Sequence, residues 1–464
     1  MAFGADTTGW LPRRLLRSAS ESYMILRRLR PGRTFSRRGF IRAAALAIPV
    51  LIPATALGRG RIPAPSDRVT LGHIGVGGQG TWLLRGFLEL EQSRSIAVCD
   101  PFRSRREAAC RDVDAHYGGT DAPLPGGACA AFNDFRELLE DPGIDAVVIA
   151  TPDHWHVPIG MAAVQAGKDV YIEKPLGLSM RENQAMRSAV HRHGRIFQYG
   201  TQQRSFNTHC AFACDLVRGG VLGELKAVHV AAPNGARGGN PAPEPVPDGL
   251  DYELWLGPAP RAPYAADRVV GEGRWHIRDY ALGFIAGWGA HPLDIAHWGF
   301  PQIPVEYEGT GVIPSEGLFN TVVDWNIRGR YAGGAEFTFT TGEDRTTFVG
   351  TKGWIAASRA DISASPESLL KIRPKPGEPR LLQNTHHYRN FVDAVRSRKT
   401  PASDIDSAVQ SDFMSHLSEM AVRLGRKIRW DPARETVIGD TEAERMMSRP
   451  MRPPWSIPTA DNRG

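Results

Sequence analysis

The residues with the clearest capacity for chemistry stand in the segment AGWGAHPLDIAHW, from Ala286 to Trp298. It places His291, Asp294 and His297 at intervals of three, a spacing that brings side chains toward one face of a helix. Three interpretations are open at this point. The side chains bind a metal ion, His291 transfers a proton in a reaction, or the polar groups only stabilise the start of a helix.

The helical geometry favours proton transfer over metal binding. If the helix begins near Pro292, side chains spaced by three drift around its axis, and His297 points away from His291. We therefore expect no metal ion here. His291 is predicted to be catalytic because histidine exchanges protons near neutral pH. Asp294 and His297 are expected to be mainly structural, with Asp294 also counted among the residues around a substrate.

A glycine-rich turn, GVGGQG, places three glycines in the spacing G-x-G-x-x-G. The first permits a tight turn, the second lets the backbone approach a pyrophosphate, and the third lets a helix pack closely. A carboxylate twenty residues further on suits the ribose hydroxyls of NAD, although arginines at 103, 105 and 106 leave NADP open. The cofactor-binding residues predicted from this pattern are Gly75, Gly77, Gly78, Gln79, Gly80 and Asp100.

Two further motifs follow later strand-like runs: ATPDHWH, from Ala150 to His156, and EKP, from Glu173 to Pro175. Ligands of α/β proteins bind at the carboxyl ends of parallel strands, where both motifs fall. A lysine held there donates to a substrate hydroxyl or stabilises an alkoxide, so Lys174 is predicted to be catalytic as well as cofactor-binding. The other cofactor contacts predicted from these motifs are Thr151, Pro152, His156 and Glu173.

The elements that must position these motifs alternate between strand-like and helix-like runs up to about residue 200. Apolar strand-like runs such as RVTLGHIGVG, SIAVCD and IDAVVIAT, separated by helical patterns, predict a doubly wound parallel sheet. From 303 to 356, runs such as NTVVDWNI and GGAEFTFTT predict an open antiparallel sheet with one covered face. Two helical patterns, HHYRNFVDAVRSRK and DSAVQSDFMSHLSEMAVRLGRK, are expected to close this second domain.

In this order, the motifs GVGGQG, TPDHWH, AGKDVYIEKPL and GAHPLDIAHW resemble the Gfo/Idh/MocA oxidoreductases, over roughly residues 69–430. The resemblance implies an α/β fold: an N-terminal Rossmann dinucleotide-binding domain and a C-terminal α/β domain with an open, mainly antiparallel sheet that commonly mediates homo-oligomer formation. It also implies NAD(P)-dependent oxidation or reduction of a CH–OH group in a sugar or cyclitol. Lys174 and His291 match the family's catalytic positions.

One position departs from the family pattern, which commonly has an acid four residues before the histidine. Here that position is Gly287. Orientation of His291 must then come from elsewhere, and Lys174, Tyr280, Asp279 and His276 are the candidates. A protein that binds NAD but has lost catalysis is one reading of this departure. The residues predicted to hold a carbohydrate substrate are Tyr199, Gln203, Arg204, Tyr280 and Asp294.

The first 56 residues hold ten arginines and only two acidic residues, which leaves 46 basic and 48 acidic residues in the remainder. The folded part therefore carries no charge pattern typical of nucleic-acid binding. Paired Arg37 and Arg38 before an apolar run resemble a twin-arginine export signal. This predicts recognition by the twin-arginine translocase and a periplasmic location, with no stable membrane insertion after cleavage. The predicted organisation is a signal peptide at 1–56, a linker at 57–68, an NAD(P)-binding domain at 69–200, a substrate-binding domain at 201–435 and a tail at 436–464.

Export constrains the chemistry, because a periplasmic enzyme has no pool of free NAD(H) with which to exchange its cofactor. We therefore expect a tightly bound cofactor that is regenerated in each cycle. An oxidoreductase that couples two sugar substrates fits this expectation. An NAD-dependent glycoside hydrolase or lyase, which works through transient oxidation at C3 of the sugar, fits it as well.

Overall fold

The computed structural model describes residues 67–118, 128–206, 208–372, 381 and 386–457. The predicted signal peptide, nearly all of the linker and the end of the predicted tail lie outside these residues. Among the described residues, no helix is both long enough and apolar enough to cross a membrane.

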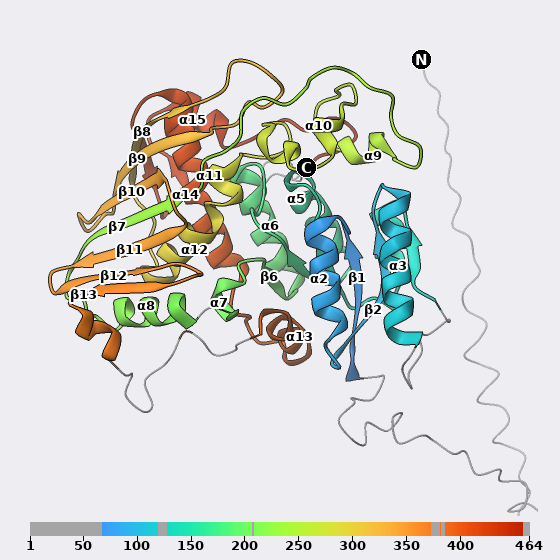
Figure 1. Cartoon of the computed structure of the whole chain (residues 1–464), viewed down its shortest axis with the longest axis horizontal. Coiled ribbons are helices and arrows are strands. Elements are labelled where there is room, and N and C mark those ends of the chain that lie inside the picture. Colours follow the sequence, from blue (N-terminus) through green and yellow to red (C-terminus); the bar gives the residue numbers. More distant parts are fainter. Residues whose placement is uncertain (1–66, 119–127, 207, 373–380, 382–385, 458–464) are drawn as a thin grey trace, which may run out of the picture. The chain divides into compact units, whose positions relative to one another are not determined.

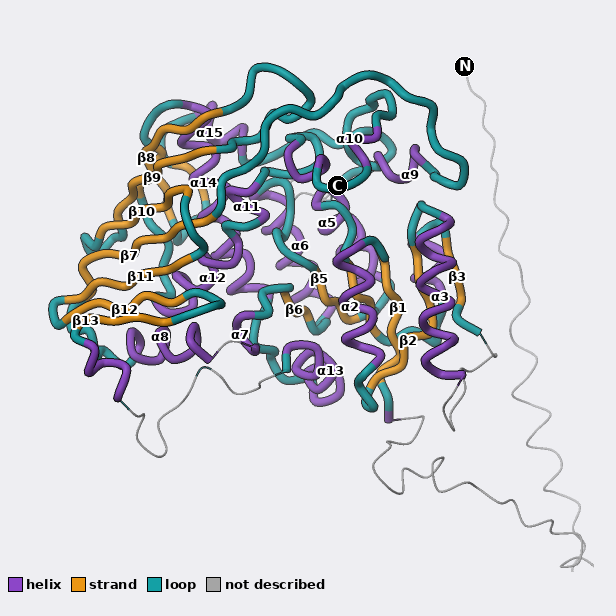
Figure 2. The backbone as a smooth tube through the Cα atoms, in the orientation of Figure 1, coloured by secondary structure: helices purple, strands orange, loops and turns teal. Residues whose placement is uncertain are grey.

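Six parallel strands form the first sheet, in the order β3-β2-β1-β4-β5-β6 (Figures 1 and 2). This order, with its reversal between β1 and β4, confirms the predicted doubly wound dinucleotide-binding fold. The short strand β3 has no counterpart among the predicted strands. The strands are β1 (Val69–Ile74), β2 (Ser93–Cys99), β3 (Ala130–Phe132), β4 (Ala146–Ile149), β5 (Asp169–Ile172) and β6 (Phe197–Tyr199).

Helices cover both faces of this sheet, as the apolar composition of its strands requires. Alternate residues of β4 enter different cores: Ala146 and Val148 pack with the Leu83 and Phe87 side chains, whereas Val147 and Ile149 join the core on the opposite face. The helical elements of this half are α2 (Gly78–Leu88), α3 (Arg103–Gly118), α4 (Phe135–Glu140), η4 (Asp153–Trp155), α5 (His156–Gln165), α6 (Met180–His193) and α7 (Gln203–Phe206).

The second sheet has nine strands in the order β13-β12-β11-β7-β10-β9-β8-β14-β15. Its pairs are antiparallel except that β7 and β10 run parallel, which confirms a mainly antiparallel sheet. The strands are β7 (Leu225–Ala232), β8 (Glu306–Val312), β9 (Asp324–Arg330), β10 (Glu336–Thr341), β11 (Arg345–Gly350), β12 (Gly353–Ala357), β13 (Ile362–Ser365), β14 (Ile428–Asp431) and β15 (Thr436–Val437).

Helices gather on one face of this second sheet, with α12 in contact with both α8 and α14 (Figure 1). Between β7 and α11 the chain makes a long excursion that carries only short helices. The predicted boundaries between domains stay predictions. The helical elements are α8 (Thr208–Arg218), α9 (Tyr252–Leu256), α10 (Ala266–Val269), η5 (Gly273–His276), α11 (Phe284–Gly287), α12 (Ala290–Gly299), η6 (Glu367–Lys371), α13 (His387–Ser397), α14 (Ile405–Leu424) and α15 (Thr441–Met446).

Helix α13 corrects one expectation, because it does not close the second domain. It packs on the first sheet instead, where Tyr388, Phe391 and Val392 enter the core with Leu71 and Phe87. Burial of a strongly apolar stripe explains the position, since this face of the parallel sheet would otherwise be open to water. The second half of the chain therefore completes the first domain.

Candidate active site

The glycine-rich turn lies directly after β1 and leads into α2. Gly75 adopts a positive φ of 83°, a conformation that glycine tolerates and other residues rarely adopt. A side chain at Gly80 would come within 1.9 Å of the Gly75 carbonyl oxygen, so the close approach of helix and turn also requires glycine there. No side chain caps the start of α2 at Gly77, whose backbone is extended. Free N–H groups at a helix N-terminus are suited to a phosphate group.

Asp100 lies at the end of β2, beside this turn. Its carboxylate accepts hydrogen bonds from the backbone N–H groups of Val76 (3.0 Å) and Phe102 (2.9 Å). Burial raises the pKa of this carboxyl. The Arg105 guanidinium stacks 3.9 Å from the centre of the Phe102 ring. A carboxylate that can accept from ribose hydroxyls and a nearby cation therefore lie together at the adenosine end expected of a dinucleotide site.

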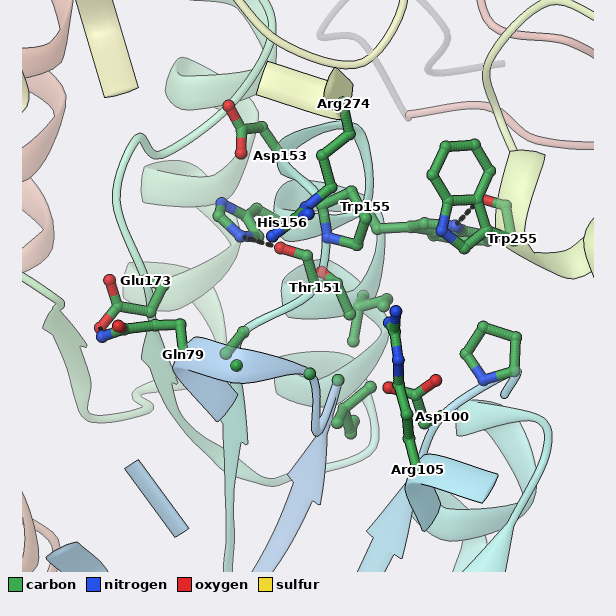
Figure 3. A pocket seen from close by; sticks show the side chains of 18 of the residues that line it. Gln79, Asp100, Arg105, Thr151, Asp153, Trp155, His156, Glu173, Trp255 and Arg274 are labelled. Carbon is green, nitrogen blue, oxygen red and sulfur yellow. Dashed lines mark hydrogen bonds between the residues drawn. The ribbon is translucent and has the colours of Figure 1, made fainter. Parts of the chain in front are cut away.

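A cavity of about 310 Å³ begins at the turn and runs past the ends of β4 and β5 (Figure 3). Of the predicted cofactor residues, only Gly80 is absent from its lining, because it lies behind the turn. The predicted residues that line the cavity are Gly75, Gly77, Gly78, Gln79, Asp100, Thr151, Pro152, His156, Glu173 and Lys174. The glycine turn, helix end and carboxylate thus fit NAD at the place that the sequence predicted.

Glu173 and His156 hold the walls of this cavity in place. The Glu173 carboxylate accepts hydrogen bonds from Gln79 (3.1 Å) and Gln202 (2.7 Å), and burial raises its pKa. The His156 ring lies between the carbonyl oxygens of Pro175 (2.6 Å) and Thr151 (2.9 Å). Because burial lowers the pKa of His156 to about 4, the neutral ring donates to one carbonyl at a time. His156 therefore lies between the ends of β4 and β5 and can donate a hydrogen bond to either one.

The excursion after β7 forms the opposite wall. The Trp155 indole N–H donates to the carbonyl oxygens of Leu254 and Trp255, both at 3.1 Å. From the same excursion, Glu272, Arg274 and other residues line the cavity. Residues 254–275 of this excursion thus supply one wall of the cavity.

A second cavity, of about 550 Å³, adjoins the first. Gln79, Lys174 and Arg274 are among the residues that line both, and His291 and Gly287 line only the second. Two spaces therefore meet at the lysine, one beside the glycine turn and one beside the histidine.

Lys174 and His291 are oriented by different partners. The Lys174 ammonium donates to the carbonyl oxygen of Gly287 at 3.1 Å. The His291 Nδ1–H donates to the side-chain oxygen of Gln203 at 3.1 Å, which leaves Nε2 for the cavity. Burial, and then the positive charges of Lys174 and Arg359, hold the His291 pKa well below its usual value. The ring is therefore neutral and able to accept a proton at Nε2.

Behind His291 lies a buried network that the sequence interpretation had placed around the substrate. Gln203 also donates to Asp294 at 3.1 Å. Arg204 binds both oxygens of the Asp294 carboxylate, at 2.6 and 2.8 Å, and neither side chain lines a cavity. This corrects the prediction for Gln203, Arg204 and Asp294, none of which lines either cavity. The charges of Arg204 and Asp294 neutralise each other beneath the site, and Gln203 links this ion pair to His291.

The two predicted tyrosines also lie away from both cavities. The Tyr199 hydroxyl donates to Asp412 (3.3 Å), and the Tyr280 hydroxyl accepts from Arg268 (3.2 Å), each with a fully buried ring. Their apolar rings are drawn into the core because both hydroxyls find polar partners there. His297 is buried as well and does not converge with His291 and Asp294. Among the described residues, no three His, Cys, Asp or Glu side chains form a metal-binding group.

Asp153 is the most informative residue that the sequence interpretation missed. It is buried and lines the first cavity together with Arg274 (Figure 3). The positive charges of Lys174 and Arg274 act on its carboxyl. Burial raises its pKa to about 7, although those two cations lower it. Its place directly after the Thr-Pro turn of β4 was a usable signal. Arg359, which lines the second cavity, gave no such signal because only the tertiary fold brings it there.

Comparison with known proteins supports this arrangement. The family description "Oxidoreductase family, NAD-binding Rossmann fold" matches residues 69–201, and "Oxidoreductase family, C-terminal alpha/beta domain" matches residues 234–457, both from the Gfo/Idh/MocA oxidoreductases. The chain belongs to this family. Membership confirms the predicted resemblance and NAD as the cofactor of the Rossmann domain.

Individual relatives are more distant. A Glycosyl hydrolase family 109 protein of Stenotrophomonas maltophilia is 33% identical over 200 residues, 42% of this chain and 41% of the relative. The scyllo-inositol 2-dehydrogenase (NAD(+)) of Bacillus subtilis is 34% identical over 112 residues, 24% of this chain and 29% of the relative. The chain thus matches well under half the length of these relatives.

A solved structure shows the same fold over most of the chain. The scyllo-inositol dehydrogenase of Lactobacillus casei, with bound NAD(H) and scyllo-inositol, superposes with a TM-score of 0.55 at 15% identity. The superposition covers 78% of this chain and 99% of that one. At this identity the likeness establishes the fold alone.

Proposed function

We propose that this protein oxidises or reduces a CH–OH group of a sugar, cyclitol or glycoside, with NAD as its redox cofactor. The observation that carries the proposal is the meeting of the two cavities at Lys174, with His291 facing the second. A substrate there would have its reacting carbon between a proton acceptor, a cation and the cofactor site.

The side chains have distinct roles in this reaction. The glycine turn and Asp100 would hold NAD, which would supply the group that accepts or returns a hydride. His291 Nε2 removes the proton of the substrate hydroxyl, because its Nδ1–H is committed to Gln203. The Lys174 ammonium donates to the same oxygen and stabilises the negative charge that develops on it. The Gly287 carbonyl keeps that ammonium in the cavity.

Location and cofactor exchange are part of the proposal. The arginine pair at 37 and 38 and the apolar run after it support export by the twin-arginine route. In the periplasm the cofactor would remain bound, and each cycle would restore it through a second carbonyl substrate. We also propose that the protein forms a homo-oligomer through its open sheet.

A second candidate, NAD-dependent cleavage of a glycoside, is favoured by the 33% identity to a Glycosyl hydrolase family 109 protein. In this reaction, transient oxidation at C3 makes the proton at C2 acidic. A base of the cavity removes that proton and the glycosidic substituent leaves. Water then adds, and the carbonyl is reduced again, so no net redox change remains.

The test begins with the protein purified without added cofactor, after removal of residues 1–56, and with its denaturation. Released NAD(H), measured by absorbance and mass, would support the self-contained cycle. An empty protein with weak NAD affinity would contradict it.

Net oxidation of a sugar with reduction of a second carbonyl would support the oxidoreductase. Cleavage of an aryl glycoside without net NADH would favour the second candidate, and His291→Asn, inactive in either assay, is the control. Bound NAD without activity, unaffected by that substitution, would mean lost catalysis.

A further inference from the structure

The mouth of the second cavity carries an aromatic side chain for which the proposed reaction has no use. Trp82, on α2, is 51% exposed and lines this cavity, whereas His291 is 5% exposed. The histidine therefore lies at the bottom and the indole at the opening. A single exposed apolar side chain is common on protein surfaces, so it is the place of Trp82 at the mouth of a ligand cavity, and not its exposure alone, that indicates a binding role.

The Trp82 indole is held in one orientation by its neighbours. Its ring makes an edge-to-face contact with the ring of Tyr388, with centroids 5.8 Å apart and planes at 77°. Tyr388 comes from α13 and lies against Gly86 of α2, where any side chain would come within 2.3 Å of its ring. Tyr388 also packs 4.9 Å from Phe87. A buried aromatic cluster thus fixes the orientation of an exposed ring, which is how a stacking platform is built.

The two inner tryptophans of the cavity differ from Trp82 in one respect. An arginine lies over each of their rings: Arg359 is 5.0 Å from the centre of Trp288, and Arg274 is 4.7 Å from the centre of Trp275. Among the described residues, Trp82 has no such cation on its ring. A ligand can therefore cover the face of Trp82 without displacing a cation, which is not so for Trp275 and Trp288.

The volume of the second cavity is larger than that of one sugar ring. One water molecule takes about 30 Å³ in the liquid, so the roughly twelve heavy atoms of a hexose take at most ~360 Å³. The second cavity measures about 550 Å³. A single ring beside His291 and Lys174 leaves space toward the mouth.

We propose that Trp82 forms an outer subsite that stacks on a second pyranose ring, so that the preferred substrate is a disaccharide or longer glycoside. The inference rests on the proposed function, because it assumes that the first ring reacts at His291 and Lys174. The apolar face of a pyranose matches the indole face, and hydroxyls of the same ring reach the polar side chains of Gln79 and Gln202 nearby. The outer ring contributes binding and takes no part in the chemistry.

The test uses the full chain with its cofactor bound, and pairs glucose with cellobiose and maltose, and galactose with lactose. Binding is measured by calorimetry and turnover by steady-state kinetics. We expect a disaccharide to bind about tenfold more tightly than its monosaccharide. Trp82→Ala should remove this difference and leave the monosaccharide within twofold, whereas Trp82→Phe should keep most of it. Trp354→Ala removes another exposed tryptophan, 37% exposed on β12 and outside the cavity, and should leave both sugar affinities unchanged.

The outcomes separate the subsite from the reaction. Trp82-dependent preference for two rings without turnover would uphold the subsite and overturn the proposed function. Turnover with equal affinity for one and two rings, or an equal loss for both in Trp82→Ala, would overturn the subsite and leave the reaction intact. Failure of the holoprotein to bind any of these sugars would overturn the subsite. Normal cofactor content and thermal unfolding in Trp82→Ala would show that the variant is folded.

Discussion

The variant Asp294→Ala tests whether the Asp294 carboxylate contacts the substrate or stabilises the fold. Its side chain is fully buried, and Arg204, 4% exposed, binds both of its oxygens. Removal of one partner from a buried pair leaves an uncompensated charge, which typically costs about 3–5 kcal/mol of stability. At about 2.1 cal/mol/K per residue over roughly 400 folded residues, this lowers the melting temperature by ~4–6 °C.

The assay is thermal unfolding of the holoprotein, followed by kinetics on any substrate that the proposed screen identifies. Asp294→Asn should lie between wild type and alanine, because it keeps an acceptor for Arg204 and loses the charge. The double variant Arg204→Met with Asp294→Leu should recover part of the stability, since both buried charges are gone. Loss of the Gln203 anchor at Asp294 should also lower kcat, through a less well oriented His291.

The alternative makes the opposite prediction. If Asp294 contacts the substrate, Asp294→Ala raises KM and leaves the melting temperature within about 1 °C of wild type. Strictly additive effects in the double variant would also refute the ion-pair reasoning, because two residues in direct contact must show coupling.

Three further predictions concern the cavities. His291→Asn keeps a side-chain N–H for Gln203 but removes the base, so kcat should fall by about 10²–10⁴ at unchanged NAD content; full activity in steady-state kinetics would contradict the assigned role. Asp153→Asn should abolish a limb of the pH–rate profile near pH 7. Because burial raises this pKa above its unfolded value of 3.8, the associated stability is present at acid pH and lost as pH rises through 7, so the same variant should melt higher at pH 8; an unchanged profile and melting temperature would refute this. Arg105→Ala should weaken NAD binding about tenfold in titrations of cofactor-free protein without altering unfolding, and unaltered affinity would place the guanidinium outside the cofactor site.

Nearly all the residues predicted to bind the cofactor line one cavity, and the sequence could indicate them because their signals are local. Gly75, Gly77 and the lysine of EKP sit in short motifs at the ends of strands, and the alternation of elements fixes where those ends meet. Asp153 stands in the motif ATPDHWH, so its place after β4 could also have been predicted, but the sequence interpretation overlooked it. The substrate side depends on partners that are distant in sequence.

The error over Arg204 and Asp294 shows why that side was harder to predict. The two residues lie 90 positions apart, and the sequence around each of them does not indicate that α7 and α12 bring them together. A charged residue next to a binding motif is most often exposed, so a role at the substrate was the natural reading. Only the tertiary fold reveals that each charge is the partner that permits burial of the other.

The buried network of Gln203, Arg204 and Asp294 also helps to explain Gly287, which stands where the family commonly has an acid. A side chain at this position would meet nothing within 4 Å, so the fold has not closed over the place where the family carries its carboxylate. An acid at this position would orient His291 and hold the Lys174 ammonium, and other groups are placed to fill both roles. Gln203, held by Asp294, orients His291, and the Gly287 carbonyl together with the nearby charge of Asp153 accommodates the Lys174 ammonium. Glycine at position 287 is therefore compatible with the proposed catalysis, because other groups orient His291 and hold the Lys174 ammonium.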